Sequence, residues 1–424
     1  MAVTTPQDQR IIIVGGGIAG LATAIALRAS NRHITVLEKS RMLRETGALI
    51  SLQPNASKIV SSWGLDPFLA PYGPMEDKAF RMFDQNGFLV REIALDTKRF
   101  GAGRMLYHRQ DLHTALRDAA TSTDLPGRPA VIRASSAVAA CDPEAGTVTL
   151  DGGKVLEADV IVGADGIHSV VRNAVVGSDE HAPIPTGISA YRILIPTETL
   201  ADLALPSDVV DLKDPVTTMI VGHDRRVIMG PGRDGKVFGV VALVPDQHMQ
   251  EDAAAKTDTK DGSSWVAEGS VEALVDAYAG FPSWLHALFR RAPDVALWQL
   301  RDVDPLPRWV RGRAVLVGDA AHAMLPTQGQ GASQSFEDAE ALQAFLADVP
   351  AGAAADEVNA ALLGAFDARF ERASLIQRYS REHARPGTDA GSGAVKLDPG
   401  QFMEYNCNYK GAKEWVSRRE SVAV

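Results

Sequence analysis

The first apolar segments of the chain are spaced as a strand, a turn, a helix and a second strand. Residues 11–14 form a short β-branched run, which is typical of a strand buried on both faces. Residues 21–29 are rich in Ala, Leu and Ile and predict a helix, and residues 33–37 predict the next strand. The pattern therefore predicts one complete strand, helix and strand unit between residues 10 and 39.

Further along, the pattern predicts two kinds of sheet. Buried strands at residues 157–162 and 313–316 fit a parallel sheet, whereas residues 130–150 alternate in the manner of antiparallel strands. A hairpin is expected at residues 80–93, with residues 84–87 (Asp-Gln-Asn-Gly) in the middle. Short apolar segments separated by turns predict an antiparallel sheet over residues 189–196, 217–222, 225–230 and 236–245.

Helices are predicted where apolar residues recur with helical spacing. These segments are residues 55–63, 108–120, 271–292 and 356–383. Residues 251–269 are polar and alanine-rich, so we expect a surface insertion or a mobile loop. Residues 386–424 read as a tail, which four aromatic side chains could dock onto the rest of the protein: Phe402, Tyr405, Tyr409 and Trp415.

The turn after the first strand carries three glycines spaced as G-x-G-x-x-G. Gly15 permits a tight turn, Gly17 lets the backbone approach a pyrophosphate, and Gly20 lets the helix pack closely on the strand. The first N–H groups of that helix then face the phosphates. Glu38 ends the second strand, at the distance where an acidic side chain binds both ribose hydroxyls. The segment therefore predicts a dinucleotide-binding, Rossmann-like fold.

The same glycine spacing recurs at residues 230–235. There a strand-like segment follows, at residues 236–244, and no helix. We therefore expect a hairpin turn at this place and no second dinucleotide fold.

Composition and charge narrow the class of protein. The length of 424 residues suggests two or three domains. The net charge of −10 is spread without a basic block, which argues against a nucleic-acid or anionic-membrane partner. With only Cys141 and Cys407, we expect no disulfide framework, no metal site and a reducing, cytoplasmic compartment. The polar N-terminus predicts neither a signal peptide nor a membrane span.

Two further pairs of glycine and aspartate follow the first motif, Asp165-Gly166 and Gly318-Asp319. In that order and at those separations, the three elements resemble the single-component flavoprotein aromatic hydroxylases, the group that includes salicylate hydroxylase and 4-hydroxybenzoate hydroxylase. The resemblance extends to about residue 383. It implies an α/β fold of the hydroxybenzoate hydroxylase type, FAD as the cofactor, and NAD(P)H, O2 and a small aromatic compound as substrates.

The resemblance also implies how the chain is divided. We expect a discontinuous, Rossmann-like FAD-binding domain at residues 8–75, 98–182 and 295–350. Residues 76–97 and 183–294 would form an antiparallel-sheet substrate domain, residues 351–385 a C-terminal helix, and residues 386–424 the tail. NAD(P)H would visit transiently, since no second dinucleotide fold is expected.

Each motif carries cofactor contacts by resemblance. In the family, the Asp-Gly motif, with Arg172 following it here, contacts FAD and the nicotinamide cofactor, and the carboxylate of the Gly-Asp motif holds the ribitol. The loop at residues 326–332 matches the one beside the isoalloxazine ring, where N–H groups at a helix start stabilise negative charge on the reduced flavin. The expected cofactor-binding residues are Gly15, Gly17, Gly20, Glu38, Lys39, Ala48, Arg109, Asp165, Asp319, Gly331 and Ala332.

Several of these residues have a simpler structural interpretation. Asp319 could cap the helix that follows it. Arg172 could be only a surface partner of Asp165, and His108 could only position Arg109. His322 has the side chain of a catalytic base, although in the family this histidine is structural.

The chemistry that the resemblance implies needs a cation or a base. NAD(P)H reduces FAD, O2 adds to give a C4a-hydroperoxyflavin, and its distal oxygen passes to an electron-rich ring, which reacts faster as a phenolate. Arg192 is the catalytic candidate, because it matches the arginine that holds the phenolate in fungal relatives. The alternative is an arginine on the outer face of a strand. Tyr191 has the opposite strand parity and should point to the other face.

The sequence departs from its relatives on the strand before residues 230–235. Several relatives carry His-x-x-x-Tyr-Pro there, whereas this chain has Arg226 and Gly230, followed by Pro231. The loss argues against simple phenol or hydroxypyridine hydroxylation, and Gly230 could admit a bulkier substrate, such as a polyketide or an indole alkaloid.

Three alternatives and one unknown remain at this point. A halogenase or a reductase could share the fold, although the W-x-W-x-I-P signature of halogenases is absent, and a sensor protein could bind FAD without turnover. The chain could act as a monomer or as a homodimer.

Overall fold

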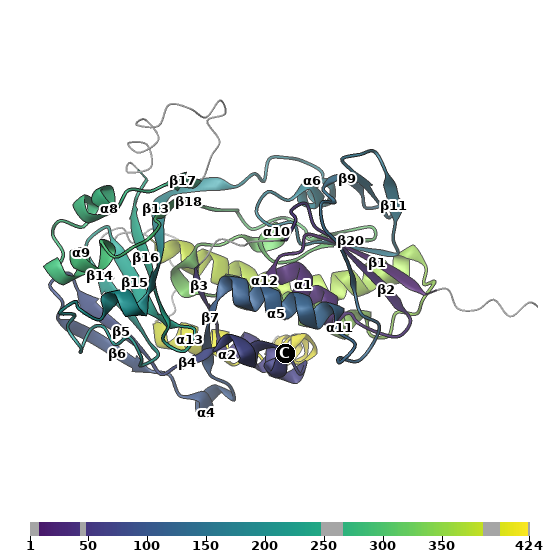
Figure 1. Cartoon of the computed structure of the whole chain (residues 1–424). Helices are drawn as coiled ribbons and strands as arrows, with labels where there is room; N and C mark the ends of the chain where they lie inside the picture. The colour runs from purple at the N-terminus through teal and green to yellow at the C-terminus, as the bar shows by residue number, and fades with distance from the viewer. Residues whose placement is uncertain (1–7, 43–47, 247–265, 385–398, 423–424) are drawn as a thin grey trace, which may run out of the picture.

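The computed structural model describes residues 8–42, 48–246, 266–384 and 399–422. In Figure 1, a mainly parallel sheet and an antiparallel sheet lie at opposite ends of the molecule. Long helices run between the two ends, among them α5 (Arg109–Thr121) and α12 (Ala355–Glu382). None of the described helices is long and apolar enough to cross a membrane.

The mainly parallel sheet has six strands in the order β19-β20-β12-β1-β2-β8. Helix α1 (Ile18–Ala26) joins two parallel neighbours, β1 and β2, so the predicted first unit is confirmed. One prediction is wrong: residues 131–133, expected in an antiparallel sheet, extend this sheet in parallel with β2. The bounds are β19 (Val310–Arg311), β20 (Ala314–Leu316), β12 (Val160–Gly163), β1 (Gln9–Val14), β2 (Arg32–Leu37) and β8 (Val131–Arg133).

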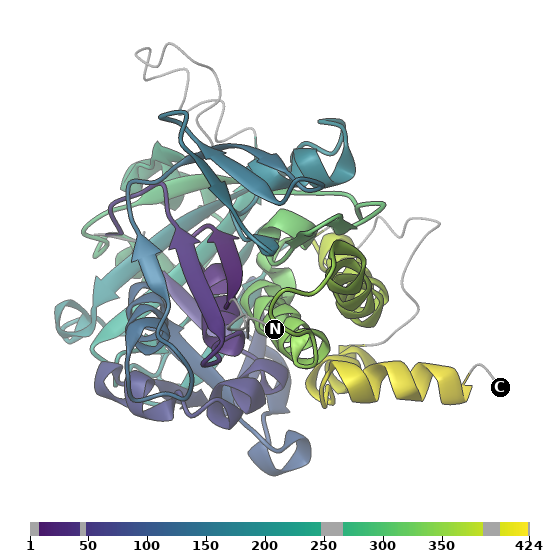
Figure 2. The ribbon, with the colours of Figure 1, turned by 90° about the vertical axis from the view of Figure 1, so that its right-hand side faces the viewer.

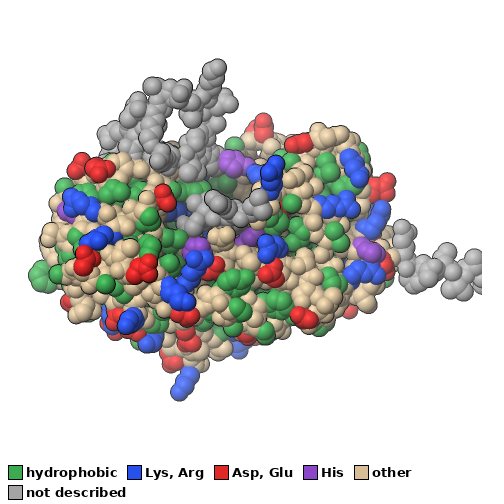
Figure 3. Space-filling view, viewed as in Figure 1, with side chains coloured by type: hydrophobic (Ala, Val, Ile, Leu, Met, Phe, Trp, Pro, Cys, Tyr) green, Lys and Arg blue, Asp and Glu red, His purple; other side chains and the backbone are tan. Residues whose placement is uncertain are grey.

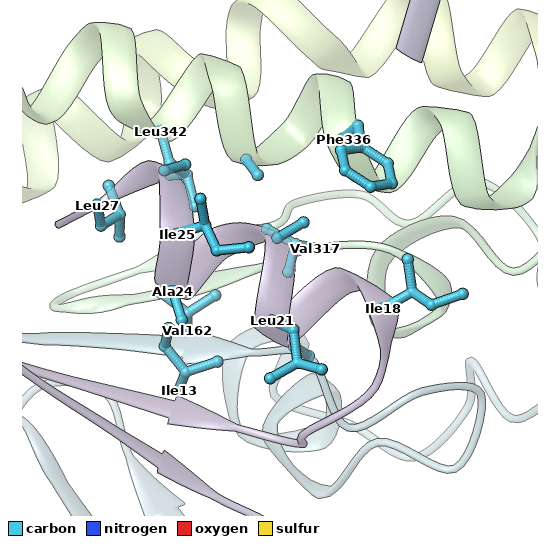
Figure 4. Packing of buried hydrophobic residues seen from close by; sticks show 14 of the residues in the cluster. Ile13, Ile18, Leu21, Ala24, Ile25, Leu27, Val162, Val317, Phe336 and Leu342 are labelled. Carbon is cyan, nitrogen blue, oxygen red and sulfur yellow. The ribbon is translucent and has the colours of Figure 1, made fainter. Parts of the chain in front are cut away.

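Helix α1 is held from two sides. Figure 4 shows Leu21 and Ile25 of α1 between the strands and α11 (Gly331–Leu346), which contributes Phe336 and Leu342. Leu21 and Phe336 are fully buried, and burying one such side chain contributes roughly 1.5–3 kcal/mol. This packing fixes the N-terminal end of α1 relative to the strand that precedes it.

The antiparallel sheet has eight strands in the order β17-β18-β13-β16-β15-β14-β5-β6, and only β14 and β5 pair in parallel. The predicted hairpin at residues 80–93 is confirmed as β5 and β6. The bounds are β17 (Val266–Glu268), β18 (Ala296–Asp302), β13 (Ile184–Pro196), β16 (Val237–Pro245), β15 (Arg226–Gly232), β14 (Val216–Val221), β5 (Ala79–Asp84) and β6 (Leu89–Ala94).

Two short helices cover one face of this sheet. They are α8 (Val271–Ala277) and α9 (Ser283–Phe289), so the prediction that residues 271–292 are mostly helical is confirmed. Pro282, which precedes α9, cannot donate a helical hydrogen bond and separates the two. The predicted insertion at 251–269 lies outside the described residues up to 265, and its end is the edge strand β17, not a loop.

Two three-stranded sheets complete the fold. The first consists of β11 (Val155–Glu157), β10 (Thr147–Leu150) and β9 (Val138–Asp142), and the second of β3 (Leu49–Leu52), β7 (Arg104–His108) and β4 (Met75–Asp77). From the second sheet, Arg104 donates to Asp77 at 2.8 Å, and Asp77 accepts from the Thr217 hydroxyl of β14 at 2.7 Å. This buried cluster ties the second small sheet to the eight-stranded sheet.

The remaining helices include two in the segment predicted to be a tail. These are α13 (Pro399–Cys407) and α14 (Ala412–Val422), seen at the C-terminal end of the chain in Figure 2. Phe402 and Tyr409 are buried, so docking of this segment through its aromatic residues is confirmed. The others are α2 (Pro54–Ser62), which begins one residue earlier than predicted, α3 (Asp66–Leu69), α4 (Thr97–Phe100), α6 (Val170–Val176) and α10 (Asp319–His322).

Candidate active site

The three glycines of the first turn have different steric surroundings. Gly15 has φ +106°, and a Cβ atom there would lie 2.3 Å from the Ala164 carbonyl oxygen. A Cβ atom on Gly20 would lie 1.9 Å from the Gly15 carbonyl oxygen, whereas one on Gly17 would meet no atom within 4 Å. The fold itself therefore demands glycine at 15 and 20, and position 17 opens onto free space.

The start of α1 suits a phosphate. Its N-cap, Gly17, provides no side-chain hydrogen bond, and the first turn contains no acidic residue. The N–H groups of the first turn of α1 and the positive end of the helix dipole therefore face the open space at Gly17 with no acidic residue of the helix beside them, which is the arrangement that binds pyrophosphate.

Glu38 stands beside this turn. Its carboxylate accepts from the N–H of Gly16 and from the N–H of Ser40, each at 2.7 Å. Burial alone would raise the pKa of Glu38, but these donors outweigh it and lower the pKa, so the side chain is ionised. The next residue, Lys39, is exposed, so both residues lie at the edge of the glycine turn.

His113 of α5 contacts the glycine turn, and the sequence analysis did not identify it. Its Nε2 lies 2.8 Å from the Gly16 carbonyl oxygen, which anchors α5 to the glycine turn. Only its position one helical turn after Arg109 could have suggested a role near the cofactor.

The middle motif uses its carboxylate to cap a helix. Asp165 accepts from the Ser169 hydroxyl at 2.5 Å and from the Val170 N–H at 2.7 Å, at the start of α6. Burial raises the pKa of Asp165. The capping role considered for Asp319 is thus filled by Asp165 at its own helix.

Arg172 connects the middle motif to the third one. It is buried, so its interpretation as a surface partner of Asp165 is wrong. Its guanidinium donates to main-chain carbonyl oxygens of both motifs, at 2.8 Å each: Ile167, Asp319 and Ala320. The two loops are therefore held side by side.

Asp319 is the first residue of α10 and does not cap it. The N-cap is Gly318, no side-chain cap bond is formed, and the Asp319 side chain is exposed. The interpretation of Asp319 as the cap of the following helix is therefore wrong. Its carboxylate lies at the surface, beside the loop that Arg172 holds.

His322, at the other end of α10, is buried in an ionic cluster. Its Nε2 lies 2.7 Å from Asp338, which also accepts from the Gly318 N–H at 2.8 Å and from Arg369 at 2.9 Å. Burial alone would raise the pKa of Asp338, but His322 and Arg369 lower it to about 2. These contacts make His322 a structural link and not a base.

The loop at residues 326–332 ends in another helix start without a cap. Helix α11 begins at Gly331, and its N-cap residue Gln330 makes no side-chain cap bond. The Gln330 side chain instead accepts from Asn55 of α2 at 3.2 Å, which fixes the loop. The first N–H groups of α11, from Gly331 and Ala332, therefore suit the negative charge of a reduced flavin.

Arg109 and Ala48 are brought together by the backbone. The Arg109 N–H donates to the Ala48 carbonyl oxygen at 2.8 Å. The preceding residue, His108, lies 3.3 Å from Arg233, which forms two 2.6 Å bonds to Asp111. Burial and then the charge of Arg233 lower the pKa of His108. His108 therefore helps fix the start of α5 against the turn between β15 and β16.

Arg192 lies on the face of β13 opposite to Tyr191. Tyr191 is fully buried in the core under α8 and α9, as its strand parity predicts. The guanidinium carbon of Arg192 lies 4.8 Å from the centre of the Trp298 ring. Burial and then the charge of Arg109 lower the pKa of Arg192 to about 10. Within the described residues no carboxylate pairs with Arg192, whose side chain is only partly exposed.

Gly230 lies on the same face of the sheet as Arg192, where the neighbouring strands bury it. Gly230 pairs with Gly239 across β15 and β16. A Cβ atom at Gly239 or Gly232 would clash with Leu49, at 2.5 and 2.6 Å, whereas the three atoms nearest to one at Gly230 are backbone atoms of Val216 and Thr217, the closest at a tight 3.2 Å. Residues 230–235 form the expected strand end and turn, with no helix after them.

Comparison with known proteins agrees with this arrangement. The family model described as FAD binding domain matches residues 8–362. Salicylate hydroxylase from Pseudomonas putida is 34% identical over 395 residues, covering 88% of this chain and 85% of its own. The FAD-dependent monooxygenase cfoG from Aspergillus candidus is 32% identical over 377 residues, covering 87% and 84%.

A solved structure gives the same picture. A salicylate hydroxylase substrate complex superposes with a TM-score of 0.77 at 29% identity, covering 97% of this chain and 98% of that one. These relatives are hydroxylases and monooxygenases, which favours turnover over the halogenase, reductase and sensor alternatives. The chain therefore belongs to the family of FAD-dependent aromatic hydroxylases, an enzyme family of flavin monooxygenases, and FAD is its cofactor.

Proposed function

We propose that this protein uses NAD(P)H and O2 to insert one oxygen atom into an aromatic substrate with an acidic hydroxyl group, and that Arg192 holds this group. One observation carries the proposal. Arg192 is a partly buried cation that no carboxylate of the described residues neutralises, and Arg109 adds a second positive charge nearby. A buried charge is costly without a counter-ion, so the site favours an anionic ligand such as a phenolate.

Different residues of the chain would bind different parts of FAD. The open turn at Gly17 and the start of α1 suit the pyrophosphate, Glu38 the adenosine ribose, Asp319 the ribitol, and the start of α11 at Gly331 and Ala332 the flavin ring. When bound, FAD supplies the reduction and oxygen chemistry, and the protein supplies orientation, charge and exclusion of water. We assign Lys39, Ala48, Arg109 and Asp165 to the same site, Asp165 through its helix cap.

Residue Gly230 supports a substrate larger than a single ring. The three atoms nearest to a Cβ built on Gly230 belong to the backbone, and the histidine and tyrosine that several relatives carry on this strand are replaced by Arg226 and by Gly230, which has no side chain. The charge of Arg192 can stabilise a phenolate without that histidine. We therefore propose a bulky phenolic natural product as the substrate class.

The test of substrate size is a direct comparison of two phenols. NAD(P)H consumption and product formation are measured with salicylate and with a bulky phenol, in the unaltered protein and in Gly230→Leu. The proposal predicts turnover of the bulky phenol and a selective loss of that activity in Gly230→Leu. Turnover of salicylate alone would overturn the bulky-substrate proposal and leave the monooxygenase activity standing.

Three further expectations belong to this proposal. NADH or NADPH would bind only transiently, since the one dinucleotide fold binds FAD. The chain would act as a monomer or a homodimer. It would work in the cytoplasm. Acidic and basic side chains are interspersed over the face seen in Figure 3, in keeping with small-molecule partners and no nucleic acid. Sedimentation of the purified protein and initial rates with each nucleotide would decide the first two.

A further inference from the structure

The last turn of α12 accepts hydrogen bonds from two parts of the candidate site, the loop before α11 and the eight-stranded sheet. The Thr327 hydroxyl, in the loop before α11, donates to the Ser380 carbonyl oxygen at 2.6 Å. From the eight-stranded sheet, the Arg226 guanidinium donates to the His383 carbonyl oxygen. A cation is favourable at this place, because the C-terminal end of a helix carries partial negative charge.

This turn also covers the face of the sheet that carries Arg192. Ala384, directly after α12, packs against a small apolar cluster that contains Ala190, Leu243 and Leu325. Ala190 lies two residues before Arg192 on β13 and therefore on the same face. The end of α12 thus forms part of the cover over the substrate side of the sheet, a cover that we call the roof (residues 376–384).

A stack of three aromatic rings joins the roof to α13. The ring of Tyr379 lies 4.0 Å from that of His383 at an interplanar angle of 29°, and 3.5 Å from that of Phe402 at 12°. Phe402 belongs to α13, and both Tyr379 and Phe402 are at most 2% exposed. Met324, which precedes the loop at 326–332, packs against the same cluster. Helix α13 is therefore in direct contact with the roof.

We propose that Phe402 and Tyr379 are positioning residues: the stacking of α13 on the last turn of α12 fixes the roof and thereby sets how tightly the aromatic substrate binds. The inference rests on the proposed function. The matched family model ends at residue 362, so it assigns no role to α13. Tyr379 and Phe402 cluster with Ile376 and Met324 and not with the turn at Gly15 to Gly20, so we expect the pyrophosphate end of FAD to stay bound.

The test compares Phe402→Ala with a matched aromatic deletion, Trp415→Ala, in the full chain. Trp415 anchors α14 by contacting Tyr405, with ring centres 5.4 Å apart, and Arg372, 5.1 Å from its ring centre. Hydrogen exchange is followed by mass spectrometry in peptides that cover the roof and residues 324–330. The second readout uses the phenol that best stimulates NAD(P)H oxidation, with KM, kcat, H2O2 release and FAD content measured separately.

We expect Phe402→Ala to speed hydrogen exchange in both peptides and to raise KM for the phenol at least fivefold. A larger share of the NAD(P)H consumed should end as H2O2. The FAD content should stay within twofold of the unaltered protein. Trp415→Ala should leave the exchange of the roof and the KM unchanged. Phe402→Leu, which keeps apolar bulk, serves if Phe402→Ala does not fold, and should show a smaller change in the same direction.

Two outcomes would overturn the inference. One is unchanged exchange in the roof peptide of both Phe402 variants. The other is an equal effect of Phe402→Ala and Trp415→Ala, or a parallel loss of FAD content and activity, which would indicate a merely structural role. If no phenol stimulates NAD(P)H oxidation in the unaltered protein, the proposed function fails, while the exchange readout still decides whether α13 holds the roof.

Discussion

The guanidinium of Arg192 lies over the ring of Trp298, its central carbon 4.8 Å from the ring centre. The aromatic face orients the cation without neutralising it, in contrast to a carboxylate. Although burial lowers the pKa of Arg192 to about 10, the side chain remains protonated at neutral pH. The substrate side of the sheet therefore keeps a fixed positive charge.

Replacement of this arginine by lysine should change both rate and pH profile. In Arg192→Lys the same burial acts on a side chain with an ordinary pKa of about 10.4, so the charge is lost at lower pH than in the unaltered protein. We expect hydroxylation to fall about 100-fold, by analogy with removal of one charge-stabilising donor, while NAD(P)H oxidation continues. The alkaline limb of the rate profile should move to lower pH. The control is Arg291→Lys, at a surface ion pair with Asp202; equal profiles for both variants would contradict the role.

Two glycines of the first turn should separate cofactor binding from folding. Gly17→Ala adds a methyl group to open space, so the thermal stability of the FAD-free protein should stay unchanged while the Kd for FAD rises at least tenfold. Gly20→Ala places the methyl group against the Gly15 carbonyl and should prevent stable folding. Thermal unfolding and flavin titration measure both quantities. Unimpaired FAD binding by Gly17→Ala would refute the assignment of the pyrophosphate to this turn.

The two aspartates of the later motifs should also behave differently. Asp165→Ala removes the acceptor of the Val170 N–H at the start of α6, where Ser169 remains the N-cap, and should lower the free energy of unfolding by about 1 kcal/mol. Asp319→Ala removes an exposed carboxylate that caps nothing, so stability should stay unchanged and FAD affinity should fall. Denaturant unfolding of the FAD-free variants, followed by FAD titration, checks both. A stability loss in Asp319→Ala with normal FAD affinity would reverse the assignment.

The buried ionic cluster behind the third motif should be essential for stability. Asp338→Asn leaves Arg369 and His322 without this carboxylate, and we expect a loss of about 3 kcal/mol in the free energy of unfolding. The folded pKa of Asp338, about 2, lies below the unfolded value of about 3.9, so the contribution is complete above pH 4 and is lost as the pH falls towards 2. The control Asp348→Asn, at an exposed site, should change stability by less than about 0.5 kcal/mol. Equal stabilities of the two variants would contradict this role.

Local sequence predicted the parts of the fold that depend on local geometry. The first strand, turn and helix were predictable because Gly15 and Gly20 satisfy steric demands of their own neighbours. The pairing of residues 131–133 with β2 was not, since a three-residue strand takes its direction from a distant partner. The apolar spacing of residues 271–292 predicted a mostly helical segment but not the break between α8 and α9, which lies before Ser283.

The candidate site shows the same division. Motif spacing identified Glu38, Asp165 and Asp319, yet it could not tell which aspartate caps a helix, because that depends on where Ser169 and Gly318 lie in three dimensions. The link made by Arg172 joins residues about 150 positions apart in the sequence, through main-chain carbonyl groups that any residue could provide. Such contacts leave no signal in a single sequence.

The most direct test of the account follows the oxygen atom. Purified protein with FAD is supplied with NAD(P)H, 18O2 and a phenol that stimulates NAD(P)H oxidation, and the product is examined by mass spectrometry. The account predicts one 18O atom per product molecule, and about 100-fold slower formation of labelled product in Arg192→Lys. A product without the label, or a protein that binds no flavin, would contradict it.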